Sequence, residues 1–150
     1  MNGLPENIEI KIFEHGYDIY NESVVLRTRI LLEPLGRDDL ASDYDEPEKD
    51  IYIGAFYGEK LIGTVILTPL KNKMVRMRQL TVDRTFRCRG IGQALVLASE
   101  EKAQEHGFKK MTLHARESAV VFYEKLDYLR IGDRFLEIDI PHWIMEKNII

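Results

Sequence analysis

Apolar positions along the chain follow two periods, which separate strands from helices. Ile8–Ile12 alternates strictly between apolar and polar residues, as expected for a strand with one buried face. Two longer apolar runs flank Tyr57-Gly58-Glu59-Lys60, and the glycine of this turn predicts a hairpin. With a turn at Pro69–Lys73 and an interruption at Pro141, the pattern predicts strands over residues 8–12, 51–56, 61–68, 74–82, 109–114, 135–140 and 143–146.

Helical periodicity occupies three other segments. Residues 18–32 show it imperfectly, whereas the apolar residues of 91–106 lie close to one helical face. Gly107 is placed as the C-cap of this second helix. A third helix is predicted over Ala119–Leu126, with Ser118 as its N-cap.

The order of these elements indicates the fold class. It is β-α-β-β-β-α-β-α-β-β, and the strand–helix–strand unit from Met74 to His114 is the one connection that requires a parallel pair. We therefore predict an α/β (α+β) fold, with a mixed, mostly antiparallel sheet and helices on both faces. Residues 1–150 are predicted to form a single domain, for which this is a normal length.

Composition excludes several classes of protein. The net charge of −4 provides no overall basic field for nucleic acid. No apolar run approaches the roughly 20 residues that cross a membrane, and residues 1–20 lack a signal-peptide pattern. The single cysteine, Cys88, permits no intrachain disulfide. We expect a cytoplasmic protein without a metal cofactor.

Charge is distributed unevenly along the chain. Pro34–Lys49 is polar and is predicted to be a loop long enough to be functional. In and beside this loop the acidic residues gather: Asp38, Asp39, Asp43, Asp45, Glu46, Glu48 and Asp50. A basic segment follows: Lys71, Lys73, Arg76, Arg78, Arg84, Arg87 and Arg89. The asymmetry would suit an anionic ligand at the basic segment and a cationic acceptor at the acidic loop, but ordinary solvated surface explains both equally well.

The basic segment ends in a loop between a predicted strand and a predicted helix. Glycines let the backbone pass close to a ligand, and the first turn of the helix presents unpaired N–H groups. The positive end of the helix dipole and the arginines add charge that attracts an anion. The loop therefore predicts a phosphate or pyrophosphate site, formed by Arg87, Cys88, Arg89, Gly90, Ile91 and Gly92.

Two sequence blocks resemble the GNAT superfamily of acyl-CoA-dependent N-acyltransferases. Gln79-Leu80-Thr81-Val82 followed by Arg87–Gly92 is similar to the family's strand and its [Q/R]-x-x-G-x-[G/A] loop. Ala119–Tyr128 is similar to the family's A-x-x-F-Y-x-K-x-G-[FY] helix. Asp127 replaces the glycine of that motif, at a left-handed position that aspartate tolerates. The stretches 114–117 and 140–142 further resemble the small ElaA-like branch.

The resemblance implies the GNAT fold and acetyl-CoA as the co-substrate. Main-chain N–H groups of Arg87–Gly92 would then wrap the pyrophosphate. Backbone groups of Leu80, Thr81 and Val82 would bind the pantetheine arm. Arg116 stands where many relatives have a pantetheine-contacting asparagine, so we expect it to reach phosphate or substrate instead.

Tyr123 has two interpretations. It shares a helical face with apolar residues and can be a core aromatic, whereas the resemblance implies that its hydroxyl protonates the departing CoA thiolate. The general base is not identified by the sequence. His142, His114 and Glu137 are candidates, and the amine can also arrive partly deprotonated.

These observations predict an N-acetyltransferase that moves an acetyl group from acetyl-CoA to a primary amine of a small molecule or protein. The transfer would be direct, within a ternary complex. The alternative is a non-catalytic acyl-CoA-binding or regulatory module, which keeps the loop without the catalysis. A nucleotide-binding domain fits poorly, because no G-x-x-x-x-G-K-[ST] pattern occurs. The sequence leaves open the acceptor, the acyl chain and the oligomeric state, a homodimer included.

Overall fold

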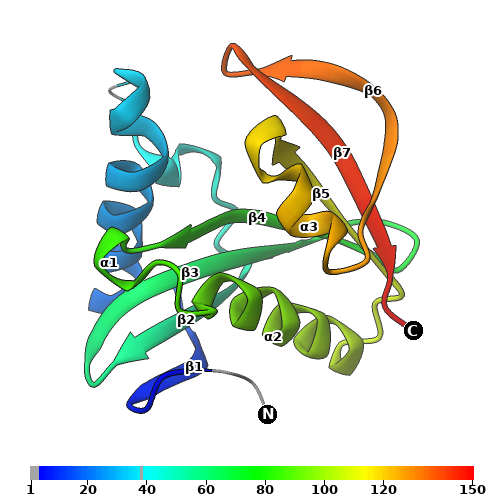
Figure 1. Cartoon of the computed structure of the whole chain (residues 1–150). Coiled ribbons are helices and arrows are strands. Elements are labelled where there is room, and N and C mark those ends of the chain that lie inside the picture. The colour runs from blue at the N-terminus through cyan, green and yellow to red at the C-terminus, as the bar shows by residue number, and fades with distance from the viewer. Residues whose placement is uncertain (1–3, 38) are drawn as a thin grey trace.

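Seven strands form one mixed sheet in the computed structural model, which describes residues 4–37 and 39–150. Their order across the sheet is β1-β2-β3-β4-β5-β7-β6 (Figure 1). Neighbouring strands are antiparallel except for β4 and β5, which confirms the predicted mixed, mostly antiparallel sheet. The strands are β1 (Ile8–Phe13), β2 (Ile51–Tyr57), β3 (Lys60–Pro69), β4 (Met74–Val82), β5 (Lys110–Arg116), β6 (Leu129–Glu137) and β7 (Ile140–Asn148).

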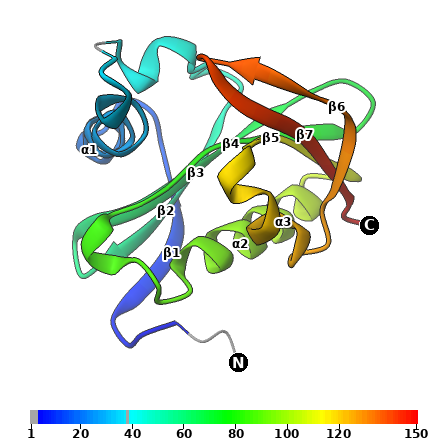
Figure 2. The same ribbon diagram turned by 45° about the horizontal axis from the view of Figure 1, so that its top comes forward.

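Helices cover both faces of the sheet, as predicted (Figures 1 and 2). On one face, α1 packs Tyr20 and Leu26 into an aromatic cluster with strand residues. On the other face, α2 and α3 contribute Ile91, Leu95 and Tyr123 to the larger core. In the described part of the chain, no helix is long and apolar enough to cross a membrane. The α-helices are α1 (Asp18–Arg27), α2 (Ile91–Glu105) and α3 (Val120–Glu124).

The first predicted helix changes its winding after Arg27. It continues as a π-helix, η1 (Thr28–Leu32), and then as a 3₁₀ turn, η2 (Glu33–Leu35). Gly36 ends it with a φ of 71°. Wide π turns are frequent at functional sites, and here Leu31 and Leu32 of η1 line a cavity of about 610 Å³. Further 3₁₀ turns are η3 (Ala41–Tyr44), η4 (Arg84–Phe86) and η5 (Glu117–Ala119).

Left-handed residues end two of the helices as predicted. Gly107 has a φ of 82°, and its N–H donates to the carbonyl of Gln104. The N–H of the next residue donates to Ala103, which completes a Schellman motif. Asp127 has a φ of 74°, so aspartate does adopt the conformation that favours glycine. The prediction of Ser118 as an N-cap was wrong, because it lies inside η5 and makes no capping hydrogen bond to α3.

The predicted strand over 135–140 has the wrong bounds: residues 135–137 end β6, which begins earlier, at Leu129, and Ile140 begins β7. Ile138 and Asp139 both have positive φ, at 47° and 61°, and form the two-residue turn between β6 and β7. The sequence did not indicate this turn, because it contains neither glycine nor asparagine, the residues typical of such turns. Pro141 does not interrupt a strand either; it is the second residue of β7 and pairs with Leu136.

Candidate functional site

β4 contains a bulge near its carboxyl end. β3 pairs with β4 at Arg78 and again at Thr81, with one residue fewer on the β3 side. Within the bulge, Gln79 has a φ of 53°, a conformation that costs about 1–3 kcal/mol in a non-glycine residue. The Thr81 hydroxyl donates to the carbonyl of Gln79 over 3.0 Å. The strand is therefore bent at the point where the predicted pantetheine-binding residues begin.

A buried ion pair holds this bulge in place. Arg27 of α1 is fully buried, and its two terminal nitrogens lie 3.0 and 2.9 Å from the two carboxylate oxygens of Asp45. The same guanidinium donates to Oε1 of Gln79 over 2.7 Å. Tyr20 donates to Asp45 over 2.6 Å, and Nε2 of Gln79 donates to the carbonyl of Ala41. This network ties α1, the acidic loop and the bulge together.

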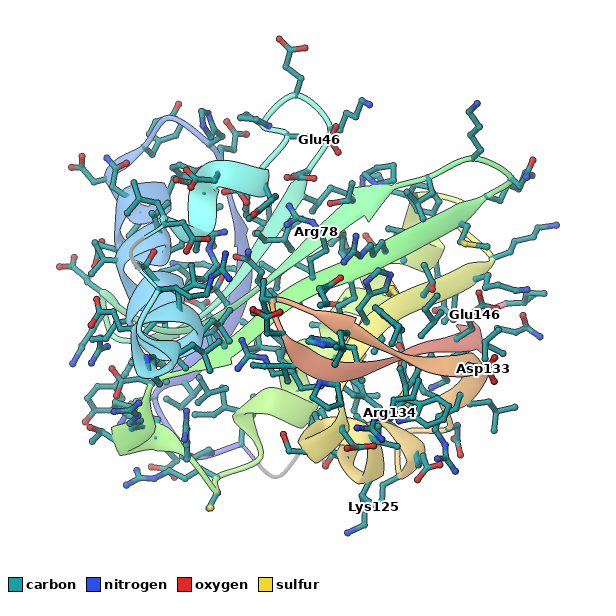
Figure 3. The ribbon with its side chains drawn as sticks, turned by 90° about the horizontal axis from the view of Figure 1, so that it is seen from above. Glu46, Arg78, Lys125, Asp133, Arg134 and Glu146 are labelled. Carbon is teal, nitrogen blue, oxygen red and sulfur yellow. The ribbon has the colours of Figure 1, made fainter. Side chains whose placement is uncertain are left out.

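Neither interpretation of the acidic segment, solvated surface or a site for a cationic acceptor, holds for two of its carboxylates. Asp45 and Asp50 have side chains that are 1% and 0% exposed, so neither is solvated surface or a free site for a cationic acceptor. Both contact Arg78, at 3.4 and 3.2 Å, and Asp50 also accepts from Thr68 over 2.6 Å. Figure 3 shows Arg78 projecting from β4 toward this loop. Asp38 lies outside the described residues.

Protonation of Asp45 at acid pH should lower the stability of the fold. Burial alone would raise the pKa of this carboxyl, but hydrogen bonds from Arg27 and Tyr20, and the charges of Arg27 and Arg78, hold the pKa below its ordinary value. Such a group contributes stability above its unfolded pKa of about 3.9, and the contribution is lost as the pH falls through the folded pKa. We expect the free energy of unfolding to decline below about pH 4.

Urea unfolding between about pH 7 and pH 3 measures this decline. Asp83 adds to it in the same direction, because hydrogen bonds from Thr85 and Arg29 outweigh the effect of burial and lower its pKa. The variant Asp45→Asn should show a shallower decline than the parent protein. An equally steep decline in the variant would show that Asp45 is not responsible.

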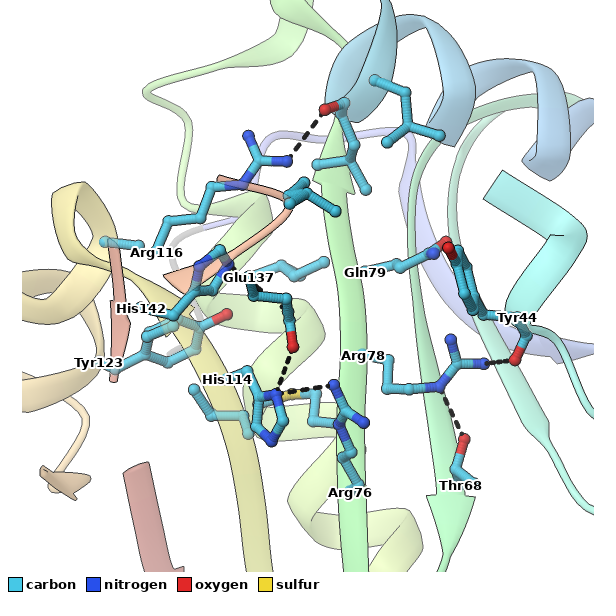
Figure 4. A pocket seen from close by; sticks show the side chains of 18 of the residues that line it. Tyr44, Thr68, Arg76, Arg78, Gln79, His114, Arg116, Tyr123, Glu137 and His142 are labelled. Carbon is cyan, nitrogen blue, oxygen red and sulfur yellow. Dashed lines mark hydrogen bonds and ion pairs between the residues drawn. The ribbon is translucent and has the colours of Figure 1, made fainter. Parts of the chain in front are cut away.

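β4 and β5 diverge after a short parallel stretch. Their pairing runs from Met74–Lys110 to Met77–Leu113, and no residue of Arg78–Val82 pairs with β5 in the described chain. A cavity of about 610 Å³ lies at this divergence. Its walls come from both strands, η1, the acidic loop, η5, Tyr123 of α3 and the β6–β7 hairpin (Figure 4).

Tyr123 reaches this cavity from α3. Its ring packs edge-on against Phe122 and Tyr128, and its side chain is largely buried, with 8% of the residue exposed. Its hydroxyl has no hydrogen-bond partner among the described residues and points toward the cavity (Figure 4). Burial raises the pKa of Tyr123, so the phenol stays protonated through the neutral range. Tyr123 is thus both a core aromatic and a free proton donor.

His142 lies beside Tyr123 and Glu137 on the cavity wall (Figure 4). Its Nδ1 is 2.8 Å from the carbonyl of Ile140, and a carbonyl only accepts, so Nδ1 carries a proton. In the neutral ring, Nε2 is then the acceptor, and it lies 3.6 Å from Oε2 of Glu137. The ring is buried, with 3% of the residue exposed. Nε2 can therefore receive a proton inside the cavity.

His114 occupies the other side of Glu137. Its Nδ1 lies 2.8 Å from Oε1 of Glu137 and 3.1 Å from a terminal nitrogen of Arg76. A single ring nitrogen either donates or accepts, so it cannot serve a carboxylate and a guanidinium at the same time. Either the guanidinium of Arg76 or the carboxylate of Glu137 therefore lacks a hydrogen bond with this nitrogen. The group that lacks it remains able to bind a ligand in the cavity.

The Arg87–Gly92 loop lies at the amino end of α2. Cys88 and Gly90 have φ of 61° and 78°, and Gly90 is the N-cap residue, with no side-chain cap. Arg89 stacks on the Phe86 ring at 5.5 Å. Gly92 has ordinary backbone geometry, and a Cβ there would make only normal contacts, at 3.6 Å or more. In the described chain, no carboxylate lies within ion-pair distance of the arginines that flank the turn, Arg84, Arg87 and Arg89.

Comparison with known proteins identifies the family. The model of the Acetyltransferase (GNAT) family matches residues 16–128. The chain belongs to the GNAT acetyltransferase family. YjcF of Bacillus subtilis (strain 168), an uncharacterized N-acetyltransferase, is 30% identical over 108 residues, which cover 71% of this chain and 76% of YjcF.

Solved structures share the GNAT fold. Escherichia coli ElaA has a TM-score of 0.77 at 17% identity, over 93% of this chain and 99% of ElaA. An aminoglycoside 6'-N-acetyltransferase complexed with coenzyme A has a TM-score of 0.77 at 21% identity, over 95% and 97%. At these identities the likeness shows the fold, and ElaA is one structural neighbour among many, so the ElaA-like branch stays a prediction. The family uses acyl-CoA, and this chain is therefore an acyl-CoA-dependent N-acetyltransferase of the GNAT family.

The structure brings some predicted site residues of this GNAT protein together and leaves others apart. Six of them line the cavity: Leu80, His114, Arg116, Tyr123, Glu137 and His142. Thr81, Val82 and the Arg87–Gly92 loop do not line it; they follow along β4 to the start of α2. The predicted residues thus form two areas, a cavity and an exposed loop, joined by the end of β4.

Sequence reasoning placed Arg76 in a basic segment but not in a cavity, and it missed the Arg27 network. The available signal was a polar stripe on the two strands of the predicted parallel pair. Arg76 and Arg78 alternate with buried apolar residues on β4, and His114 and Arg116 do so on β5. Charged residues two apart on neighbouring strands share a face, and burying them requires partners or a ligand.

Proposed function

We propose that this GNAT protein is an N-acetyltransferase that transfers an acetyl group directly from acetyl-CoA to a primary amine, within a ternary complex. The observation that carries the proposal is the divergence of β4 from β5. It leaves the strand Arg78–Val82 unpaired on one side and opens a cavity next to it, into which Tyr123 points. A closed sheet would offer neither backbone groups nor space to a thioester.

The loop has the features that a diphosphate needs. Its left-handed turn at Gly90 exposes the first N–H groups of α2, and its arginines lack carboxylate partners in the described chain. We assign Arg87–Gly92 to the pyrophosphate of CoA and the backbone of Leu80, Thr81 and Val82 to the pantetheine arm. Acetyl-CoA supplies the activated acyl group when it is bound.

Within the cavity, Tyr123 and His142 have complementary roles in this proposal. Nε2 of His142 accepts a proton from the attacking amine, and Glu137 at 3.6 Å stabilises the imidazolium that forms. Tyr123 donates its proton to the departing sulfur. Burial raises the pKa of the phenol, but it also raises the proton affinity of a thiolate in the same cavity, so the donor and the acceptor shift together.

A thiol-release assay tests the activity. Purified protein with acetyl-CoA and a panel of primary amines should release CoA in an amine-dependent manner, and calorimetry should detect CoA binding without an amine. Binding without turnover on any amine would favour the non-catalytic acyl-CoA-binding module. Absence of CoA binding would overturn both readings.

The loop assignment predicts that Gly90→Val weakens CoA binding about tenfold or more, because a side chain blocks the approach of the pyrophosphate and φ of 78° strains a β-branched residue. Calorimetry with CoA measures the change. Gly58→Val is the matched control, since Gly58 has a φ of 61° in the β2–β3 turn and open space around it. Equal losses of affinity in the two variants would show that backbone strain, and not the loop's contact with CoA, is the cause.

A further inference from the structure

Three arginines line the cavity, and they differ in how far the protein neutralises them. Arg78 is neutralised by Asp45 and Asp50, and it also donates to Thr68 and to the carbonyl of Tyr44. It is therefore part of the framework. Arg76 and Arg116 have no carboxylate within ion-pair distance among the described residues.

Arg76 has donors that nothing in the described chain satisfies. Its Nε is buried and has no hydrogen-bond partner. One terminal nitrogen faces Nδ1 of His114 at 3.1 Å, but the shorter contact of that atom, 2.8 Å, is with Glu137. If Nδ1 donates to the carboxylate, it offers Arg76 no lone pair. A buried guanidinium nitrogen without an acceptor in the protein calls for one from a ligand.

Arg116 is in a similar position at the opposite end of the cavity (Figure 4). It makes one hydrogen bond, from a terminal nitrogen to the carbonyl of Leu31 over 2.9 Å, and its other donors have no partner in the described chain. Burial lowers the pKa of both Arg76 and Arg116, which is the opposite of what a close carboxylate would do.

The carboxylates of the cavity do not balance this charge. Asp39 pairs with Arg37, Glu46 pairs with Lys49, and Glu137 faces two histidines. Among the described carboxylates of the cavity lining, Glu137 is thus the one whose negative charge acts on the guanidiniums of both Arg76 and Arg116. With neutral histidines, one positive charge remains uncompensated in a confined space.

We infer that the acceptor is an amine that also carries an anionic group, a carboxylate or a phosphate, and that Arg76 binds this group while Arg116 adds positive charge at the opposite end of the cavity. The inference rests on the proposed function and names its substrate class. The amine would face His142 and Glu137, while the anion meets the unpartnered donors of Arg76. The phosphates of CoA are assigned elsewhere, because Arg87–Gly92 does not line the cavity.

Matched amine pairs test the inference. An α-amino acid is compared with its amide, and O-phosphoethanolamine with ethanolamine, so that each pair differs in one anionic group and the two pairs separate carboxylate from phosphate. We expect kcat/KM for one or both anionic members to exceed that of the neutral partner by about tenfold or more. Calorimetry on the CoA-bound protein should show the same order of affinities.

Variants test whether Arg76 causes the preference for anionic amines. Arg76→Gln should remove most of this preference and raise KM for the anionic amine, while KM for acetyl-CoA stays unchanged. Arg76→Lys should restore part of the preference, because it returns the positive charge. Arg134→Gln is the control, since Arg134 lies on β6 in an exposed pair with Glu117 at 3.5 Å and does not line the cavity (Figure 3).

Equal use and equal binding of the charged and neutral amines would overturn the inference, even if acetyl transfer is robust. A preference that Arg76→Gln leaves intact would overturn the role of Arg76. If CoA binds and no amine is acetylated, the proposed function is wrong, whereas the inference about the anion is tested separately. Calorimetry with the charged and neutral amines on the CoA-bound protein then decides whether the cavity selects an anion.

Discussion

Tyr123→Phe is expected to lower kcat by more than about tenfold, while the affinity for CoA stays within about twofold of the parent value. The substitution removes only the hydroxyl, which is directed into the cavity and has no partner among the described residues. The ring keeps its edge contacts with Phe122 and Tyr128, so the fold should be unaffected. Steady-state thiol release gives kcat, and calorimetry gives the dissociation constant of CoA.

Tyr52→Phe is the matched control for this prediction. Tyr52 is 2% exposed, its hydroxyl is also buried without a partner, and it does not line the cavity. Loss of that hydroxyl should leave kcat unchanged. An unchanged kcat in Tyr123→Phe would remove Tyr123 from the mechanism and leave it as a core aromatic.

Arg27→Met should lower the free energy of unfolding by about 3–5 kcal/mol. Methionine fills much of the volume, but it leaves the buried Asp45 without its bidentate partner and Gln79 without its donor at 2.7 Å. Removing one member of a buried pair is costly, because the remaining charge stays out of water. Denaturant unfolding at neutral pH measures the change.

Arg134→Met provides the comparison with an exposed pair. Arg134 and Glu117 have side chains that are 54% and 51% exposed, and such pairs contribute about 0–1 kcal/mol. The two variants remove the same functional group from opposite environments. Similar losses of stability in both would contradict the structural role given to Arg27.

Local chemistry made much of the fold predictable. Gly107 ends α2 in a left-handed conformation because glycine has no Cβ to clash, and Gly58 turns the β2–β3 hairpin for the same reason. The single parallel pair followed from the length of the crossover between Met74 and His114, since a short turn can join only antiparallel strands.

Prediction failed where a residue adopted a conformation that its type does not favour. Ile138 and Asp139 form a left-handed turn without glycine, so one strand was predicted across this turn, over 135–140, and a second strand over 143–146. Gln79 is held in its left-handed conformation by Arg27, far away in the sequence. No local pattern of the sequence records this tertiary contact of Gln79.

The same division applies to the candidate site. The Arg87–Gly92 loop could be predicted because glycines, arginines and a helix start are contiguous in the chain. The polar cluster of the cavity could not, because Arg76, His114 and Glu137 come from three strands and meet only when β4, β5 and the β6–β7 hairpin are in place. Its charge balance depends on which carboxylates find other partners.

The sequence by itself determined the order and type of the elements, the position of the loop and the family, because these depend on neighbouring residues. Only the tertiary structure decided that Asp45 and Asp50 are buried partners of Arg27 and Arg78, because their burial depends on α1 and β4 packing over them. It also decided that Nε of Arg76 lacks a hydrogen-bond partner among the described residues, since a donor is free or paired only relative to groups that folding brings within reach.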